Sequence, residues 1–476
     1  MIFTQFAFFV LLAFAIVAVA VTARSEIRKL IILGSSFVFY GWWDWRFLGL
    51  VLVSTTIDFL AGLLIESTRQ NTDQSTAKLG LSVAVAANLL ILGVFKYFDF
   101  FSLNIATAFA QIGVRIDPVL LHVALPIGIS FYTFHAISYA VDVYRGDVAA
   151  SRNYIDYLNF VMFFPQLVAG PIARASHLLP QVRKGFEVQI AGVHSGSQLF
   201  VFGLVKKLVI ADNLAPVVDR VFSNPNPKFI DVVFAGLGFM TQIYCDFSGY
   251  TDMARGSARM FGISLADNFK FPFIVANPRD FWHNWHISLS TWLRDYLFIP
   301  LGGSRGSSSF VARNLMVTML LGGLWHGASW NFVLWGGFHG GWLVLHRMYA
   351  QREIGAALER LIGSLTYRTV AWLAFTALTL FGWIIFRCSQ SSEQLGTALS
   401  ALAHPSFAFT ITTPNMRWVA GAFLIAIGLQ VWQRSVGPEP WQAFNLGQRS
   451  AWYVTCLLCL LWFSRQETNP FIYFQF

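Results

Sequence analysis

Residues 311–346 read VARNLMVTMLLGGLWHGASWNFVLWGGFHGGWLVLH, and from Asn314 to His346 they include no Asp, Glu, Lys or Arg. The stretch is too long for one crossing of a bilayer, which takes about 20 residues of helix, and too apolar for an ordinary loop. Glycines lie on both sides of His326 in its middle. Glycine lets a backbone break or a second helix approach closely, so the stretch indicates membrane-embedded helix that is interrupted or tightly packed near His326.

Blocks of the same apolar character recur along the whole chain. Of its 476 residues 56% are hydrophobic and only 12% are charged, which is about half the charged share of a soluble domain. Because backbone polar groups in lipid must pair within their own segment, these blocks predict transmembrane helices. The blocks lie near 2–22, 30–46, 47–65, 79–97, 119–141, 154–172, 189–212, 230–247, 311–346, 367–386, 415–433 and 450–464. We expect an all-α, polytopic integral membrane protein with roughly ten to twelve transmembrane helices, plus re-entrant or interfacial helices.

The distribution of charge between the blocks predicts an orientation. Loops 23–29, 347–368 and 434–449 carry several Lys or Arg residues and are expected in the cytoplasm, whereas 388–414 carries none and is expected outside. Both termini then lie outside, and 2–22 is a first transmembrane helix because its positive charges follow it, unlike those of a signal peptide. The net charge of +9 fits this pattern and includes no basic, aromatic-rich cluster for nucleic acid.

The segment NPRDFWHNWHISLSTWLRDYLFIPLGG (277–303) concentrates aromatic and ionisable residues. Asn277 and Pro278 form a helix start, and Pro300 and the following glycines form a stop. One continuous helix would place two sets of residues on neighbouring faces. The first set is Trp282, Trp285, Leu289, Trp292 and Tyr296, and the second is Arg279, His283, His286 and Ser290. The second face is expected to line a polar cavity; alternatively, its histidines are hydrogen-bonded interface residues.

Two histidines within the membrane allow a definite chemistry. A neutral imidazole can take a proton from a hydroxyl group, whose oxygen then attacks a thioester. The sequence holds no G-x-S-x-G, Ser-x-x-Lys or H-E-x-x-H pattern, and His283 and His286 have no third metal ligand at a supportive spacing. Acyl transfer without a covalent enzyme intermediate fits these residues, and so does a proton relay in a transporter.

At these residues the chain resembles the membrane-bound O-acyltransferase family. The matching segments run in family order and together are highly specific. They are LPIGISFYTFHAISYAVDVYRG (125–146), FFPQLVAGPIAR (163–174), YCDFSGYTDMARG (244–256), NFKFPF (268–273), FWHNWHISLSTWLRDYLFIPLGGSR (281–305) and GGLWHGASWNFVLWGGFHG (322–340).

The resemblance implies a single membrane-embedded domain over residues 1–476, with a motif-rich catalytic core at 125–346 and helices around a central tunnel. The histidine of the family's W-H-G motif falls on His326, which would act as the base or position the acceptor hydroxyl. The second family histidine falls on His286, which would bind or orient the substrate. Further substrate-binding or tunnel-lining residues are expected at His283, Ser290, Trp325, Ser329, Asn331 and Asp252.

For three of the residues in these motifs the expected role is less specific. Asp246 and Asp252, in YCDFSGYTDM, are expected to be structural or tunnel-lining rather than catalytic. His283 has no assigned family role, because relatives often carry basic residues at its position and the next. No metal is expected.

The stretch LFIPLGGSR (297–305) is similar to the subgroup that acetylates alginate-type polysaccharides, more than to the teichoic acid D-alanylation subgroup. This likeness implies transfer of an acyl, and most simply an acetyl, group from a cytoplasmic thioester across the bacterial inner membrane to a periplasmic or extracellular acceptor. Acetyl-CoA is the expected co-substrate, with no bound cofactor. The expected partners are membrane lipid, a periplasmic SGNH-hydrolase-like acetyltransferase and polysaccharide synthesis and export proteins. The alternatives are a proton-coupled transporter and a non-catalytic component of a secretion complex.

Overall fold

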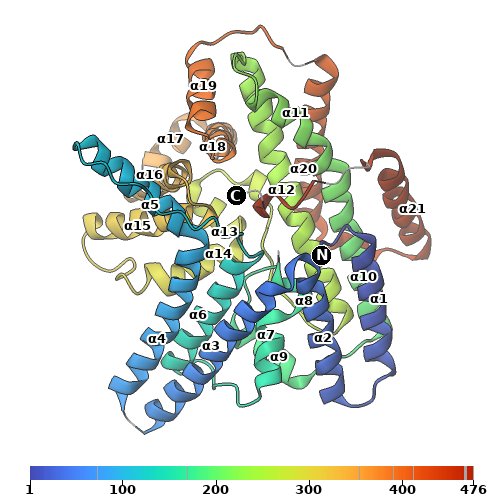
Figure 1. Cartoon of the computed structure of the whole chain (residues 1–476). Coiled ribbons are helices and arrows are strands. Elements are labelled where there is room, and N and C mark those ends of the chain that lie inside the picture. The colour runs from blue at the N-terminus through green and yellow to red at the C-terminus, as the bar shows by residue number, and fades with distance from the viewer. Residues whose placement is uncertain are drawn as a thin grey trace. The chain divides into compact units, whose positions relative to one another are not determined.

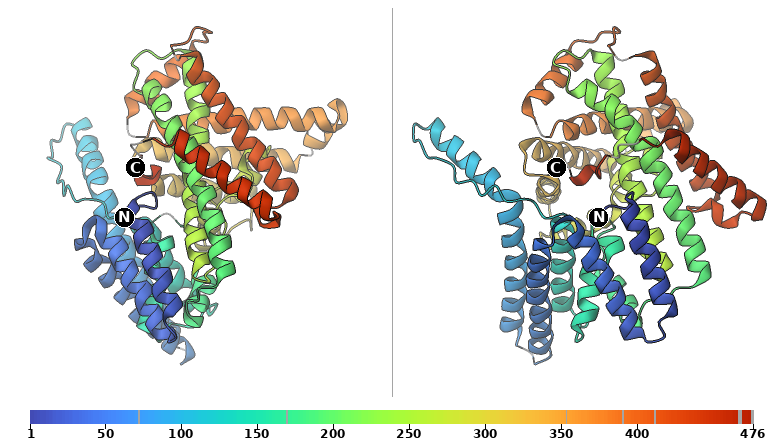
Figure 2. Two further views of the ribbon diagram at one scale, coloured as in Figure 1. Left: turned by 90° about the vertical axis from the view of Figure 1, so that its right-hand side faces the viewer. Right: turned by 45° about the vertical axis from the view of Figure 1, so that its right-hand side comes forward.

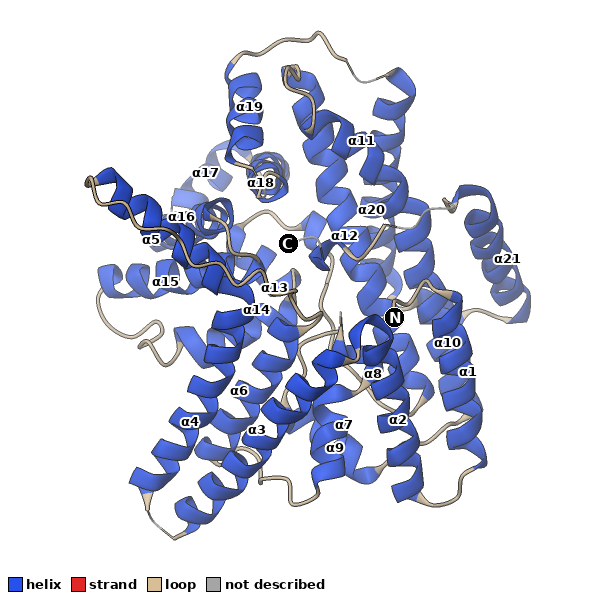
Figure 3. Ribbon diagram, in the orientation of Figure 1, coloured by secondary structure: helices blue, strands red, loops and turns tan. Residues whose placement is uncertain are grey.

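A computed structural model describes residues 1–476 except 72, 169, 353, 390, 411, 466–468 and 475–476, and describes residue 474 without its side chain. The described part is helical, and its only β pairing is an isolated bridge between Phe269 and Trp285 (Figure 3). The predicted all-α class is therefore confirmed. The chain forms two compact units, residues 1–200 with 251–266 and residues 201–250 with 267–476. The single domain over 1–476 stays a prediction.

Unit 1 contains the helices from α1 to most of α10, with bounds α1 Phe6–Val21, α2 Ser25–Asp44, α3 Arg46–Gln70, α4 Gln74–Leu92, η1 Gly93–Tyr97, α5 Phe98–Gln111, α6 Ile129–Arg145, α7 Tyr154–Met162, α8 Phe164–Leu167, α9 Ala175–Lys184 and α10 Ile190–Leu204. Helices α3, α4 and α6 pack side by side (Figures 1 and 2). Gly62 makes this packing close, because a Cβ there would lie 2.6 Å from the hydroxyl of Tyr139 on α6.

Unit 2 contains the segments that hold the predicted site. Their bounds are η2 Val205–Ala211, α11 Asp212–Phe222, α12 Phe229–Met260 (which continues into unit 1), η3 Pro272–Ile274, α13 Pro278–Asn284, α14 Ile287–Leu293, η4 Arg294–Phe298, α15 Ser308–His326, α16 Trp330–Gln351, α17 Ile354–Ile362, α18 Ser364–Arg387, α19 Ser392–Ala403, α20 Thr413–Val436, η5 Pro440–Ala443, α21 Leu446–Phe463 and η6 Ile472–Phe474. Helix α16 packs against α15, α18 and α13.

Glycine residues allow α15 and α16 to pack closely against each other. A Cβ at Gly323 of α15 would overlap the carbonyl oxygen of Phe332, and one at Gly336 of α16 would overlap that of Met319. The two backbones therefore approach each other closely, because glycine has no side chain to separate them. The apolar stretch 311–346 is an interrupted and tightly packed helical pair, as its glycines predicted.

Five described helical stretches are long and apolar enough to cross a membrane, namely Arg46–Gln70, Gln74–Gln111, Phe229–Met260, Ser364–Arg387 and Thr413–Val436. Helix α1 is apolar but shorter. Several long, apolar helices agree with a multi-pass membrane protein. The total of ten to twelve spans stays a prediction.

Candidate active site

The break between α15 and α16 places His326 at the end of a helix. Helix α15 ends at His326, Gly327 is extended, and the Ser329 side chain caps α16 by accepting a hydrogen bond from the Asn331 backbone N–H at 3.3 Å. The Ser329 hydroxyl donates to the Ser389 carbonyl at 2.6 Å, and the Asn331 amide donates to the Cys388 carbonyl at 2.7 Å. These contacts hold the loop between α15 and α16, which follows His326, against the residues just after α18. A substrate-contacting role for Ser329 and Asn331 stays a prediction.

The helix start predicted at Asn277 is confirmed, but the single helix that was to follow it is wrong. The Asn277 side chain accepts from the Asp280 N–H at 2.8 Å, and Pro278 is the first residue of α13. The helix ends at Asn284 because Trp285 is extended and His286 has a left-handed backbone with φ 43°. A new helix, α14, then begins.

Tertiary hydrogen bonds explain this interruption. Trp285 pairs with Phe269, and the N–H of Ile287 donates to the carbonyl of Asn268 at 2.9 Å. The buried Asn268 side chain also accepts from the N–H of Ser288 at 3.2 Å. Backbone groups that would extend α13 are thus satisfied by residues 268–269 instead.

The turn at His286 separates residues that a continuous helix would have placed together. His283 and Ser290, with Arg279 and Trp282, line a hollow of about 210 Å³ that does not include His286. His286 is 1% exposed and packs edge-on against Phe247, with ring centroids 4.7 Å apart. The predicted shared face of Arg279, His283, His286 and Ser290 is therefore wrong. A substrate-contacting role for His283 and Ser290 stays a prediction.

The turn instead brings His286 to His326. Their ring centroids are 6.4 Å apart, and Trp325 lies beside both, at 5.8 Å from His286 and 5.1 Å from His326. His326 is 5% exposed and also contacts Trp335 and Phe386, at 5.0 Å and 5.2 Å. Two imidazoles from different helices thus share one enclosed aromatic environment.

The His286 ring lacks the partners that a buried imidazole normally has. Among the described residues, neither of its ring nitrogens has a hydrogen-bond partner. His286 lies outside the candidate spans, and burial lowers the pKa of its imidazole to about 3, so the ring is neutral at physiological pH. A neutral imidazole offers one donor and one acceptor, and leaving such a group unpaired costs about 1–3 kcal/mol. The ring is therefore available to a ligand.

A residue near the end of the chain completes this site, and the sequence analysis did not identify it. The ring centroid of Tyr473, in η6, lies 5.5 Å from that of His326 and 6.1 Å from that of His286. Its hydroxyl is buried without a hydrogen-bond partner in the part of the chain that the structure describes. The only signal available was the aromatic run at 471–474, since no spacing relates it to either histidine motif.

A buried ion triad holds this segment in place. The Asp246 carboxylate accepts from the backbone N–H of Ile472 at 2.7 Å and pairs with Lys207 at 2.7 Å. Lys207 also pairs with Asp212 at 2.7 Å, and all three side chains are almost fully buried. The contacts give Asp246 a structural role. Asp252 belongs to unit 1, where it pairs with Arg255 at 3.8 Å, and its tunnel-lining role stays a prediction.

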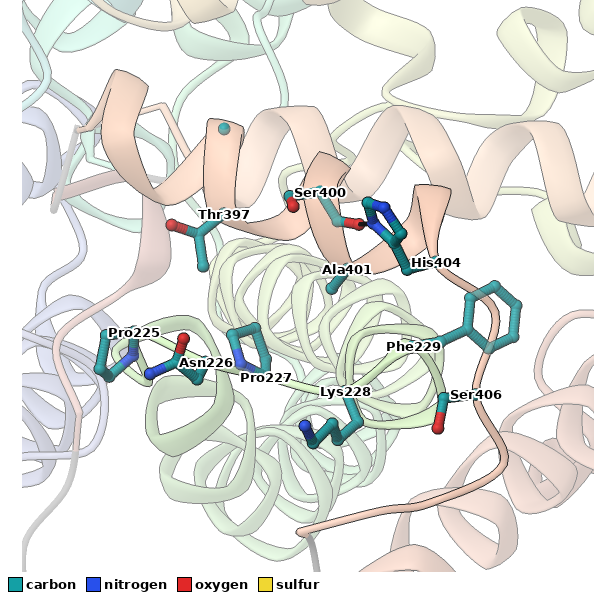
Figure 4. Close-up of a pocket in the computed structure, with 11 residues that line it drawn as sticks. Pro225, Asn226, Pro227, Lys228, Phe229, Thr397, Ser400, Ala401, His404 and Ser406 are labelled. Atoms are coloured by element: carbon teal, nitrogen blue, oxygen red, sulfur yellow. Dashed lines mark hydrogen bonds between the residues drawn. The ribbon is translucent and has the colours of Figure 1, made fainter.

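A separate hollow of about 550 Å³ lies between α19 and the loop that precedes α12 (Figure 4). Lys228, Ser400 and His404 are among its lining residues, and the Nδ1 atom of His404 lies 2.8 Å from the Ser400 carbonyl oxygen. None of the predicted site residues lines it. His404 is thus a useful control histidine.

Comparison with known proteins identifies the class of enzyme to which this chain belongs. A profile of the membrane-bound O-acyltransferase family matches residues 37–353, and the chain belongs to this family. It is a multi-pass membrane protein and an O-acyltransferase.

Several proteins with more specific names are similar to this chain. A probable alginate O-acetylase AlgI of Pseudomonas putida is 38% identical over 482 residues, covering 94% of each chain. One of Azotobacter vinelandii is 43% identical, covering 76% of this chain and 70% of its own. A peptidoglycan O-acetyltransferase of Helicobacter pylori is 35% identical, covering 77% of this chain and 72% of its own. Teichoic acid D-alanyltransferases match more distantly, at 28% identity for that of Bacillus subtilis. The predicted family is confirmed, and so is the predicted greater likeness to alginate O-acetylases than to teichoic acid D-alanyltransferases.

Proposed function

We propose that this protein transfers an acetyl group from a cytoplasmic thioester donor, acetyl-CoA, to a hydroxyl acceptor outside the inner membrane, and so serves O-acetylation of a cell-surface polysaccharide. The observation that carries the proposal is the pairing of His286 and His326, two buried imidazoles whose ring centroids are 6.4 Å apart. The two rings are thus close enough for both to lie beside the same small group of a ligand.

His326 is proposed as the general base. Its imidazole takes the proton of the acceptor hydroxyl while that oxygen forms a bond to the thioester carbonyl carbon. The tetrahedral intermediate then expels the thiolate, the carbon–sulfur bond breaks, and the imidazolium returns its proton to sulfur. The products are an ester and a free thiol, and His326 is again neutral. No covalent acyl-enzyme is required.

His286 and Tyr473 are proposed to position the thioester and to stabilise the charge on its oxygen. A neutral imidazole N–H and a phenol O–H are both hydrogen-bond donors, and in the described part of the chain neither residue has a partner for its polar atoms. Donors that are already placed where negative charge develops lower the barrier most in a water-poor site. The aromatic rings around His326 make this site water-poor.

The relatives' names support a polysaccharide acceptor, and the charge pattern supports the proposed orientation. Named relatives act on alginate and on peptidoglycan, so a polysaccharide hydroxyl is the proposed final acceptor. We propose that a periplasmic SGNH-hydrolase-like acetyltransferase receives the acetyl group and works with polysaccharide synthesis and export proteins. We propose that the positively charged segments 23–29, 347–368 and 434–449 lie in the cytoplasm and that the N-terminus lies outside, an orientation that the positive-inside rule supports.

The experiment is complementation of cells that lack the gene. Polysaccharide O-acetyl content is measured after expression of wild type, His326→Ala or the control His404→Ala, at matched protein levels. Loss of acetylation in His326→Ala alone is the expected result. Wild-type acetylation in that variant would contradict the proposal and agree with a non-catalytic component. A histidine-dependent proton flux without acetylation in any strain would favour the transporter.

A further inference from the structure

A basic hollow in unit 2 has no role in the mechanism above. It has a volume of about 760 Å³ and is lined by the loop 270–277, by α13 and by the ends of α18 and α20. Lys270, Arg368 and Arg434 contribute three positive charges, and Asp280 contributes one negative charge. All three cations are exposed, and among the described residues none of them forms an ion pair.

The walls of this hollow are fixed by buried contacts. The backbone N–H of Phe273 donates to the side chain of Gln430, a fully buried residue of α20, at 2.9 Å. The Trp372 indole of α18 donates to the Phe273 carbonyl at 2.8 Å. The loop is thereby tied to both helices, and the hollow does not depend on free side chains for its shape.

The backbone that carries Lys270 is also constrained. The N–H of Lys270 donates to the carbonyl of Asn284 at 3.0 Å, and the next residue, Phe271, has a left-handed backbone with φ 55°. A non-glycine residue in that region is strained, and such strain is common where a backbone is shaped around a ligand. The one carboxylate of the hollow is engaged, because Asp280 accepts from the Asn277 amide at 2.8 Å. Three positive charges and one negative charge leave the hollow with a net positive charge.

From this cluster we infer a binding site for a phosphate group, held by Lys270, Arg368 and Arg434. Three positively charged side chains line one hollow, and the planar fork of arginine matches two phosphate oxygens at once. Arg368 of α18 and Arg434 of α20 lie near the ends of two candidate spans, at the edges of the stretches 347–368 and 434–449 that the charge pattern predicts in the cytoplasm. Basic pockets between helices at this level bind lipid head groups, and the same chemistry binds nucleotide phosphates.

Two sources can supply the phosphate on this face. The first is the nucleotide part of a coenzyme A thioester, a source that rests on the proposed function. The second is the head group of an anionic phospholipid, which does not. Helix α13 connects the hollow to the reaction centre, because Asn284 lines the hollow and His286 follows two residues later.

Binding of two probes tests the inference without any turnover. Unacylated CoA is titrated by calorimetry into protein in phosphatidylcholine nanodiscs, and retention of phosphatidylglycerol in detergent is measured by native mass spectrometry. Arg368→Gln/Arg434→Gln is compared with Arg352→Gln/Arg360→Gln, which removes the same charge from exposed sites nearby. The exposed Lys270→Gln serves as a second test if the double variant does not fold.

Weakening of one probe by at least about tenfold in the Arg368/Arg434 or Lys270 variant, with the control unchanged, is the expected result. The affected probe identifies the source as nucleotide or lipid. Equal binding of both probes by variant and control, or no binding by wild type, would overturn the inference. Acetyl transfer by wild type is measured in parallel, so failure of this site and failure of the proposed function remain distinct.

Discussion

The imidazoles of His286 and His326 lie with their ring centroids 6.4 Å apart because two helices are interrupted at these residues. His286 occupies a left-handed turn between α13 and α14, and His326 is the last residue of α15. Interrupted helices in membranes expose backbone and side-chain polar groups only where the protein encloses them. The interruptions at His286 and His326 bring their two side chains into one site.

The backbone at His286 permits a clean test of its side chain. Asn tolerates the left-handed region better than Ala does, so His286→Asn keeps the turn while removing the imidazole. We expect acetyl transfer to fall by about 100-fold, with the melting temperature within about 3 °C of wild type. Turnover is measured with purified protein and labelled acetyl-CoA. Full activity in His286→Asn would remove His286 from the mechanism.

The Tyr473 hydroxyl should contribute to activity and not to stability. Tyr473→Phe keeps the ring packing on Phe247, whose centroid is 4.7 Å away, but removes a buried hydroxyl that lacks a described partner. Removing such a group is neutral or stabilising, so the melting temperature should stay equal or rise. Turnover should fall by about 10- to 100-fold if the hydroxyl stabilises the oxyanion. Unchanged turnover would contradict this role.

The buried triad predicts a large loss of stability when its cation is removed. Lys207→Met leaves Asp212 and Asp246 buried together without their shared cation, which should cost about 3–5 kcal/mol. The control is Arg387→Met, which breaks a more exposed pair with Asp219 and should cost less than about 1 kcal/mol. Thermal unfolding in detergent measures both. Similar melting temperatures for the two variants would contradict the structural role of the triad.

Helix α16 offers a matched pair of glycines. Gly336→Ala should destabilise the protein by about 1–3 kcal/mol, since its Cβ would overlap the carbonyl of Met319. Gly341→Ala, on the same helix with nothing within 4 Å of its Cβ, should be neutral or stabilising by up to about 1 kcal/mol. Thermal unfolding again provides the measurement. An equal effect at both positions would mean that the close α15–α16 contact is not important for stability.

Local features were predictable from the sequence. Apolar blocks predicted the long helices, Asn277 and Pro278 predicted the start of α13, and the glycines near His326 predicted an interrupted, closely packed pair. Each of these signals lies within the segment that it describes, so interactions between residues close in sequence were sufficient to predict these features.

The arrangement of the site could not be predicted in the same way. The turn at His286 depends on hydrogen bonds to Asn268 and on the bridge from Trp285 to Phe269. Helical periodicity carries no information about these tertiary contacts. It therefore predicted His286 on the same helix face as His283. The approach of Tyr473 depends on Asp246, a residue of a distant helix. The choice of His286 and His326 as one pair came from family resemblance rather than from spacing.

The most direct measurement is thioester consumption by purified protein in nanodiscs. Labelled acetyl-CoA is supplied with and without the candidate periplasmic partner, and wild type is compared with His326→Ala and the control His404→Ala. The account predicts turnover in wild type and His404→Ala, and a loss of at least about 100-fold in His326→Ala, with all three proteins equally folded. Turnover by His326→Ala at the wild-type rate would contradict the assignment of His326 as the base.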